Sequence, residues 1–262
     1  MRRETQNVLL VLLGATILKL VITGDYLRYV KPTHLAWLIG GAVVVAGLGA
    51  IAIWRDIRRN MAATRDRNQE VPQPDGVAEP ACGSDDGGGH SHSTPVSWML
   101  LAPVLAVFLI APPALGADSV QRSGERSVSS DSSRAASAEF EPLPDEEVVA
   151  LPVVDFVRRA AWDDSGSLDG RTVALTGFVV HQEGEVQLAR MVIACCAADA
   201  TPVTVRLGGR AGPQVRQFDE DEWIRVTGTL VPGSATEHNN FTPELDTRQV
   251  DGVPEPRQPY ER

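Results

Sequence analysis

Lysine, aromatic residues and cysteine are scarce in this chain, and each shortage excludes a class of protein. Residues 117–262 contain no lysine and carry a net charge of −11, so with +1 on residues 1–116 the whole chain reaches −10. Such an acidic region repels nucleic acid phosphates, and 5% aromatic residues are too few for a base-stacking surface. Three cysteines, at positions 82, 195 and 196, are too few for a disulfide scaffold.

Familiar catalytic patterns are missing as well. The sequence contains no Ser-His-Asp arrangement, no phosphate-binding glycine loop and no strong carboxylate pair. We therefore predict that the protein is not an enzyme and that it has no nucleic acid partner.

Long apolar runs are plentiful in the first half, where we predict a membrane region over residues 1–116 with spans at about 7–22, 35–54 and 96–116. Residues 35–54 carry no charge and as a helix would be about 30 Å long, the thickness of the hydrocarbon layer. Lys19, near the end of the first span, can snorkel to the interface; a functional partner inside a permease is the alternative.

The third span has two interpretations. Its tail, residues 114–117, reads Ala-Leu-Gly-Ala and resembles a signal-peptidase site, so the segment is either retained in the membrane or cut as an internal signal. Retention is favoured because two spans precede it. Arginines at the N-terminus and in loop 55–95 predict that both are cytoplasmic. Three crossings of the plasma membrane then leave residues 117–262 outside the cell.

Two segments read as linkers. Loop 55–95 includes a stretch rich in Pro, Gly, Asp and Ser, which cannot bury enough apolar surface to fold. Residues 117–140 are predicted to be a disordered tether. A weak metal-binding pattern lies in the first of these segments, formed by His90, His92, Cys82, Asp85 and Asp86.

Residues 141–262 are predicted to form an extracytoplasmic β domain. Apolar residues at helical spacing predict a helix over 153–162. Alternating β-branched residues predict strands over 171–181, 186–196, 202–207 and 222–231, and a short strand within 244–253. The pattern Val/Ile-x-Leu/Val-Thr-Gly, which occurs at residues 173–177 and 224–228, suggests a small closed all-β barrel of the OB type with one leading helix. Gly177 suggests a bulge or sharp bend.

The adjacent cysteines Cys195 and Cys196 are the most distinctive chemical feature. If the strand extends through Cys196, their side chains point to opposite faces; they converge only if the strand ends there. Three interpretations stay open. The cysteines are small core residues, or a redox pair whose strained disulfide is easily reduced, or ligands of a zinc-like divalent metal together with Asp199 and a histidine, His181 or His238.

Three blocks of sequence carry a family resemblance: RMVIACCAADATPVTV from residue 190, DEWIRVTGTL from residue 221, and PYE near the C-terminus, all preceded by apolar spans. In these blocks the chain resembles the YcgQ-type family of permease subunits. The resemblance implies a non-catalytic subunit, anchored in the lipid bilayer and paired with a multi-span permease of the YcgR type. Its outer domain would bind a solute, such as a metal ion, or the permease. The alternative is an outward-facing thiol redox or metal-handling protein that acts without a transporter.

Overall fold

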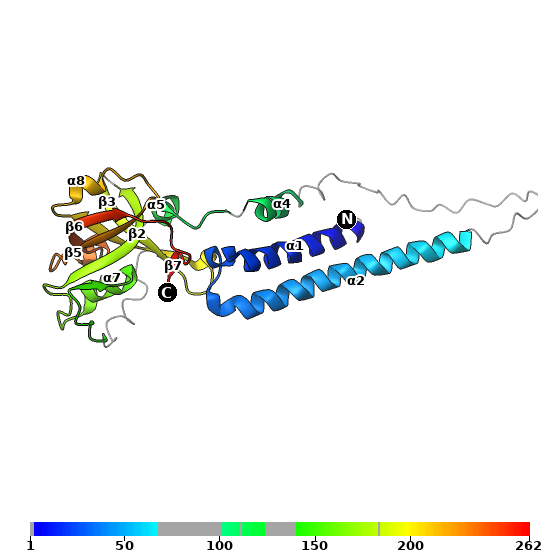
Figure 1. Cartoon of the computed structure of the whole chain (residues 1–262), viewed down its shortest axis with the longest axis horizontal. Coiled ribbons are helices and arrows are strands. Elements are labelled where there is room, and N and C mark those ends of the chain that lie inside the picture. Colours follow the sequence, from blue (N-terminus) through cyan, green and yellow to red (C-terminus); the bar gives the residue numbers. More distant parts are fainter. Residues whose placement is uncertain (1–2, 68–100, 111, 124–139, 183) are drawn as a thin grey trace, which may run out of the picture. The chain divides into compact units, whose positions relative to one another are not determined.

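The chain divides into two compact units in a computed structural model that describes residues 3–67, 101–110, 112–123, 140–182 and 184–262 (Figure 1). The N-terminal unit comprises Met1–Asp25 and Leu35–Pro112, and the C-terminal unit comprises Tyr26–His34 and Pro113–Arg262. The short segment between the first two helices, Tyr26–His34, therefore folds with the C-terminal unit. We call this segment the helix connection.

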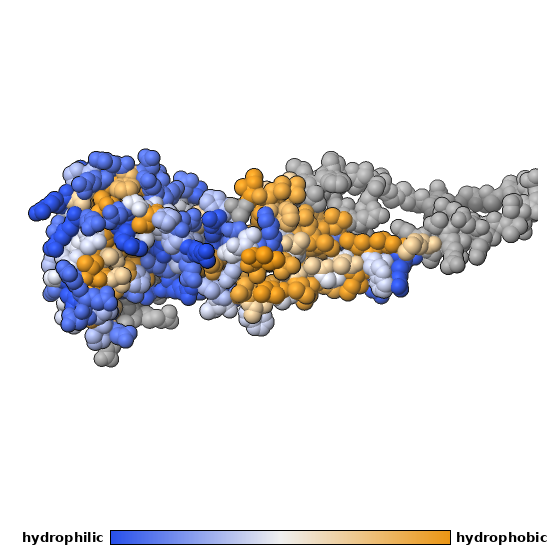
Figure 2. Space-filling model, in the orientation of Figure 1, coloured by the Kyte–Doolittle hydropathy of each residue, from blue (hydrophilic) through white to orange (hydrophobic). Residues whose placement is uncertain are grey.

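Two helices of the N-terminal unit are long and apolar enough to cross a membrane, α1 (Arg3–Thr23) and α2 (Leu35–Arg67). Much of their surface is hydrophobic (Figure 2), which agrees with the first two predicted spans. They pack closely, because a Cβ added at Gly14 would lie 2.7 Å from the Cβ of Ala46. Of the third predicted span, the structure describes helix α4 (Leu101–Leu109), while the segment before it lies outside the described residues. The third span stays a prediction.

The C-terminal unit is built on a mixed sheet of seven strands in the order β1-β2-β5-β6-β4-β3-β7, with a further pairing of β2 with β3. Three pairs are parallel: β1 with β2, β4 with β6, and β3 with β7. The strands are β1 (Val148–Ala150), β2 (Thr172–Gln182), β3 (Glu185–Val192), β4 (Thr201–Gly208), β5 (Trp223–Leu230), β6 (Glu244–Gly252) and β7 (Tyr260–Glu261).

Helices and helical turns complete the C-terminal unit. They are η1 (Asp25–Arg28), which begins at the last residue of the N-terminal unit, η2 (Pro32–His34), α5 (Ala117–Ser123), α7 (Val153–Trp162), η4 (Ala197–Asp199), α8 (Gly212–Val215) and η5 (Glu237–Asn239). Helix α7 occupies the predicted range, because its apolar stripe of Val153, Phe156 and Val157 is buried against the sheet.

The prediction of a β-rich domain with a leading helix is confirmed, and the prediction of a plain closed all-β barrel is corrected. The sheet is mixed and ends on two strands, β1 and β7, that the sequence did not reveal. Both are only two or three residues long and each pairs in parallel with a longer strand. Such short segments show too little alternation of polar and apolar residues to be recognised.

Residues 117–123, expected to be part of the tether, instead form helix α5. Ala117 and Val120 are buried in a second apolar cluster that includes Phe178 and Met191. The Asp221 carboxylate accepts a hydrogen bond of 2.5 Å from the N–H of Ala117 at the start of the helix. Residues 124–139 lie outside the described residues.

Gly177 marks the point where β2, paired with β5, also begins to pair with β3. A Cβ at this position would lie 2.5 Å from the carbonyl oxygen of Ala189, so close approach of the two strands requires glycine. A register shift occurs instead in the pairing of β5 with β6, between Thr227 and Gly228. Close packing, rather than a bulge, explains this glycine.

Candidate functional site

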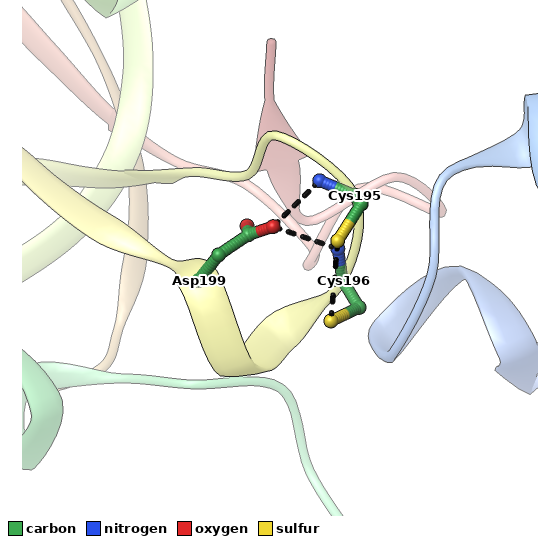
Figure 3. Close-up of side chains that lie close together, drawn as sticks. All are labelled: Cys195, Cys196 and Asp199. Atoms are coloured by element: carbon green, nitrogen blue, oxygen red, sulfur yellow. Dashed lines mark hydrogen bonds between the residues drawn. The ribbon is translucent and has the colours of Figure 1, made fainter.

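The adjacent cysteines lie in a loop, not in a strand. Strand β3 ends at Val192 and β4 begins at Thr201. The intervening residues 193–200, which we call the cysteine loop, contain Cys195, Cys196 and the turn η4. The expectation that the strand continues through Cys196 is therefore wrong. The loop leaves the sheet because a side chain within it satisfies the backbone N–H groups that a strand would pair (Figure 3).

That side chain is the carboxylate of Asp199. Its Oδ1 accepts a hydrogen bond of 2.8 Å from the N–H of Ala194, and its Oδ2 accepts bonds of 2.7 and 3.3 Å from the N–H groups of Cys195 and Cys196. This arrangement turns the two cysteine side chains toward each other, with 3.6 Å between their Sγ atoms (Figure 3). The two sulfurs and a carboxylate oxygen all lie within 4.8 Å of one another.

Both cysteines are free thiols, and neither is a core residue: Cys195 is exposed and Cys196 is partly exposed. The interpretation of the pair as small packing residues is therefore overturned. Among the residues that the structure describes, these two cysteines and Asp199 form a group whose ligand atoms are close enough together to hold one metal ion.

The Asp199 carboxylate shifts the pKa of the neighbouring thiol. The hydrogen bond from the Cys195 thiol to this carboxylate, with a further one to Cys196, raises the pKa of Cys195 from 9.0 to about 11. For Asp199 itself, burial raises the pKa, but hydrogen bonds from the Cys195 thiol and three backbone N–H groups outweigh burial, and the net pKa is lowered. At neutral pH the resting site therefore holds an ionised carboxylate beside a protonated Cys195.

The helix connection pairs with the cysteine loop. Val30 and Cys196 form an antiparallel bridge. The N–H of Lys31 donates to the carbonyl of Cys195 at 3.2 Å, and the N–H of Ala197 donates to the carbonyl of Tyr29 at 2.7 Å. These residues are about 165 positions apart in the sequence, so no local pattern could have revealed the contact.

The predicted histidine ligands do not join this group. His181, at the end of β2, hydrogen bonds through Nε2 to the carbonyl of Phe218 at 3.1 Å, and His238 lies in η5. The loop residues His90 and His92, and the other members of that weak pattern, lie outside the described residues.

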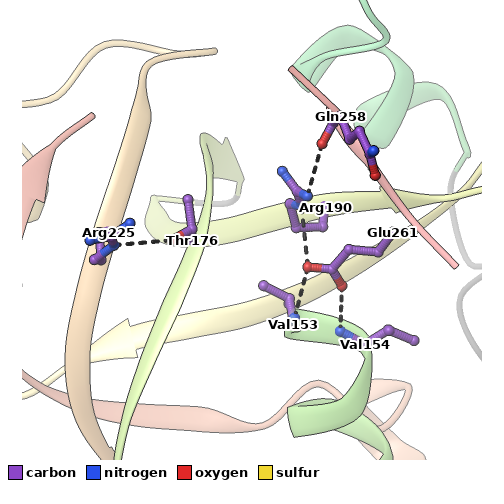
Figure 4. A network of polar contacts seen from close by, with 7 residues as sticks. All are labelled: Val153, Val154, Thr176, Arg190, Arg225, Gln258 and Glu261. Carbon is purple, nitrogen blue, oxygen red and sulfur yellow. Dashed lines mark hydrogen bonds and ion pairs between the residues drawn. The ribbon is translucent and has the colours of Figure 1, made fainter. Parts of the chain in front are cut away.

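A second polar cluster, which sequence reasoning missed, is buried beside β3 (Figure 4). Glu261 accepts bonds of 2.9 and 2.8 Å from the N–H groups of Val153 and Val154 at the start of α7, and it pairs with Arg190 at 3.2 Å. The side chains of Arg190 and Glu261 are 9% and 10% exposed. Burial raises the pKa of Glu261, although these hydrogen bonds and the charge of Arg190 oppose the shift.

This buried cluster stabilises the fold rather than forming an open site. The Arg190 guanidinium also lies 4.9 Å from the ring centroid of Trp223. The neighbouring Tyr260 hydroxyl accepts a 3.0 Å hydrogen bond from the N–H of Leu115. The last residues of the chain therefore secure both α7 and the segment that leads into α5.

Comparison with known proteins identifies one family model. No curated protein and no solved structure matches the chain. These comparisons do not confirm the resemblance to YcgQ-type permease subunits, which stays a prediction. Residues 161–261, which include the cysteine loop and strands β2 to β7, match the model described as the DUF1980 C-terminal domain.

Proposed function

We propose that this protein is a plasma-membrane accessory subunit of a multi-span permease of the YcgR type, whose outer domain binds a soft or borderline metal ion such as zinc. The main support for a metal site is that two exposed or half-exposed thiols and a carboxylate lie together, with their sulfur and oxygen atoms within 4.8 Å of one another. Thiolates are preferred ligands of zinc and of softer ions. Cys195 and Cys196 would bind the ion directly.

The spacing of the sulfurs supports tetrahedral coordination. Two thiolates about 2.3 Å from one tetrahedral zinc ion are roughly 3.8 Å apart, close to the 3.6 Å between the Sγ atoms. A linear two-sulfur complex would need a wider separation. With two thiolates and at most one oxygen from Asp199, at least one coordination position is left for water or a partner's ligand. Such an open site suits an ion that is captured and passed on.

Asp199 contributes mainly by shaping the loop. Three backbone N–H groups already occupy most of its lone-pair positions. Its negative charge next to the sulfurs favours a bound cation, which would displace the thiol proton of Cys195 into solvent. We therefore assign Asp199 a positioning role beside the two sulfur ligands.

The connectivity of the chain supports an odd number of membrane crossings. The helix connection is hydrogen bonded to the cysteine loop. If α1 and α2 cross the membrane, the helix connection and the cysteine loop therefore lie on the same side of it. Helix α2 then ends on the opposite side, and the chain must cross again between Arg67 and Pro113. This agrees with the predicted third span. Basic residues at the N-terminus and in the C-terminal part of α2 favour the cytoplasm, which leaves the cysteine loop outside.

Helix α4 supports retention of that third span. It packs against α1, where the Lys19 ammonium donates a hydrogen bond to the carbonyl of Phe108 and lies 5.0 Å from the centroid of its ring. In addition, the segment after α4 is packed into the C-terminal unit: Ala117 is buried and its N–H is hydrogen bonded. A signal peptidase needs an accessible segment, so we propose that residues 114–117 are not cut.

We also propose that the strands of the C-terminal unit form an OB-like domain, and the strand pairings support this proposal. Within the larger sheet, β2 pairs with β3, β3 with β4, β4 with β6, β6 with β5, and β5 again with β2. These pairings link the five longer strands, with β4 and β6 as the parallel pair among them. OB-type domains use such a frame to carry binding loops, and here the loop between β3 and β4 is the cysteine loop.

Zinc titration of the full chain in mild detergent tests the metal site. We expect one zinc ion per chain, and loss of at least about 90% of the binding in the Cys195→Ser/Cys196→Ser double variant. The Cys82→Ser variant, which removes the third cysteine, is the matched control and should bind normally. Equal binding by the double variant and the wild type would refute the site. Copurification with a YcgR-type permease tests the partner, and recovery of the chain alone would count against it.

A redox function is the second candidate, because two free thiols only 3.6 Å apart could be oxidised to a disulfide. The raised pKa of Cys195 weighs against it, since the thiolate is the reactive form. Reversible loss of two thiols under mild oxidants, without any zinc binding, would favour the redox function over the metal site.

A further inference from the structure

We infer that the helix connection, the segment that joins the two apolar helices, supports the metal site through its backbone, so that metal binding and ordering of the connection favour each other. This inference rests on the proposed metal function of the cysteine loop. It concerns a different set of atoms, namely the backbone groups of Tyr29, Val30 and Lys31.

The contact is made by backbone atoms on both sides of Cys196. The N–H of Lys31 donates to the carbonyl of Cys195, immediately before Cys196, and the N–H of Ala197, immediately after Cys196, donates to the carbonyl of Tyr29. Cys196 is thus held in an antiparallel bridge opposite Val30. Asp199 fixes the loop from one side and the helix connection fixes it from the other.

The helix connection has its own attachments. Its first turn is closed by hydrogen bonds from the N–H groups of Tyr29 and Val30 to the carbonyl of Tyr26. Arg28 forms an ion pair of 3.6 Å with Glu255, in the segment just before β7. The helix connection is therefore an ordered part of the C-terminal unit, held by its own hydrogen bonds and ion pair.

Covalent continuity gives this contact a consequence. Only residues 24 and 25 separate the end of α1 at Thr23 from the start of the connection. Its last turn, η2, leads directly into Leu35, the first residue of α2. Binding of an ion by both sulfurs fixes the backbone of Cys195 and Cys196, and with it the carbonyl and N–H groups that face Tyr29 and Lys31. Metal binding and ordering of the connection should therefore favour each other, because linkage is reciprocal.

Amide hydrogen exchange in the full chain tests the coupling. Zinc should slow exchange at the Lys31 and Ala197 amides, which lie on opposite sides of the bridge, in detergent-solubilised wild type. The Lys31→Pro variant removes the donating N–H, and proline favours an extended residue before it, which suits Val30 in its antiparallel bridge. The matched control Lys31→Ala removes the same side chain but keeps the N–H.

We expect Lys31→Pro to weaken zinc binding roughly two- to tenfold, the worth of one backbone hydrogen bond, and Lys31→Ala to bind as the wild type does. If zinc binds normally to Lys31→Pro, and in the wild type leaves exchange at the Lys31 amide unchanged, the coupling is wrong while the metal site stands. If the wild type binds no zinc at all, the proposed metal function itself fails. Equal weakening in both variants would assign the effect to the lysine side chain and overturn the backbone coupling.

Discussion

Asp199 and Glu261 have the same local role in opposite surroundings. Each carboxylate accepts backbone N–H groups at the beginning of a helical segment: Asp199 holds the start of η4, and Glu261 holds the start of α7. Asp199 lies next to exposed thiols, whereas Glu261 is buried and paired with Arg190. Burial decides the outcome: the buried carboxylate stabilises the fold, and the accessible one shapes a site that solutes can reach.

The largest effect should come from replacing Glu261, the buried carboxylate, and it should appear in the stability of the fold. Glu261→Ala leaves the Arg190 charge buried without its partner and uncaps α7, so we expect a loss of about 3–5 kcal/mol in the free energy of unfolding of the C-terminal unit. Pulse proteolysis of the full chain in urea measures it. Arg225→Ala removes an exposed hydrogen bond to Thr176 on the same sheet (Figure 4) and is the control, with an expected loss below about 0.5 kcal/mol. Similar losses in both variants would contradict this account.

The second prediction is that zinc binding at the cysteine loop, beside the accessible carboxylate of Asp199, depends on pH. The pKa of Cys195 is raised to about 11, so its thiol is protonated at neutral pH and must release a proton when it binds zinc. Affinity should therefore rise about tenfold per pH unit for this proton between about pH 6 and pH 8. Competition titration against a chromophoric chelator measures the slope. An affinity that is flat with pH would exclude Cys195 as a thiolate ligand.

The third prediction concerns the charge of Asp199. Asp199→Asn replaces the carboxylate that raises the pKa of Cys195, chiefly through the hydrogen bond from the thiol and also through its charge, so the pKa should fall toward 9.0 and the thiolate fraction at neutral pH should increase. Because a less basic thiolate is also less nucleophilic, we expect alkylation by iodoacetamide to accelerate only about tenfold. Asp163→Asn is the matched control, since Asp163 holds a turn at Ser165 and Ser167 that contains no cysteine. If the alkylation rate of Asp199→Asn equals that of the wild type, Asp199 does not influence the Cys195 thiol.

The smallest effect is expected at Tyr260. Tyr260→Phe removes the hydroxyl that accepts the N–H of Leu115, which should cost about 1 kcal/mol and loosen the segment before α5. Limited proteolysis of the full chain should then cut near Leu115 several times faster. If the cutting rate does not change, the hydroxyl is not what holds this segment in place.

Much of the fold could be predicted because its signals are local. The helix over 153–162 and five of the seven strands follow from residue spacing within windows of about ten residues. Helix α5 and strand β7 could not be predicted, because their stability comes from partners far along the chain, such as Asp221 for Ala117. Segments this short have no periodicity of their own.

The candidate site was predictable only in part, for the same reason. Cys195, Cys196 and Asp199 lie within five residues of sequence, so their residue types drew attention to the right loop. The histidines were proposed from chemistry alone, and the fold does not bring His181 or His238 into the cluster. The partner that the structure supplies is the backbone of the helix connection, which no pattern of side chains can indicate.

The most direct test of the central claim, an accessible metal-binding thiol pair outside the membrane, is labelling of intact cells with a membrane-impermeant maleimide. The chain should carry Cys82→Ser, so that Cys195 and Cys196 are its remaining thiols. We predict labelling without permeabilisation and protection by added zinc. Labelling that requires permeabilisation would contradict the outward orientation, and labelling that zinc does not reduce would contradict the metal site.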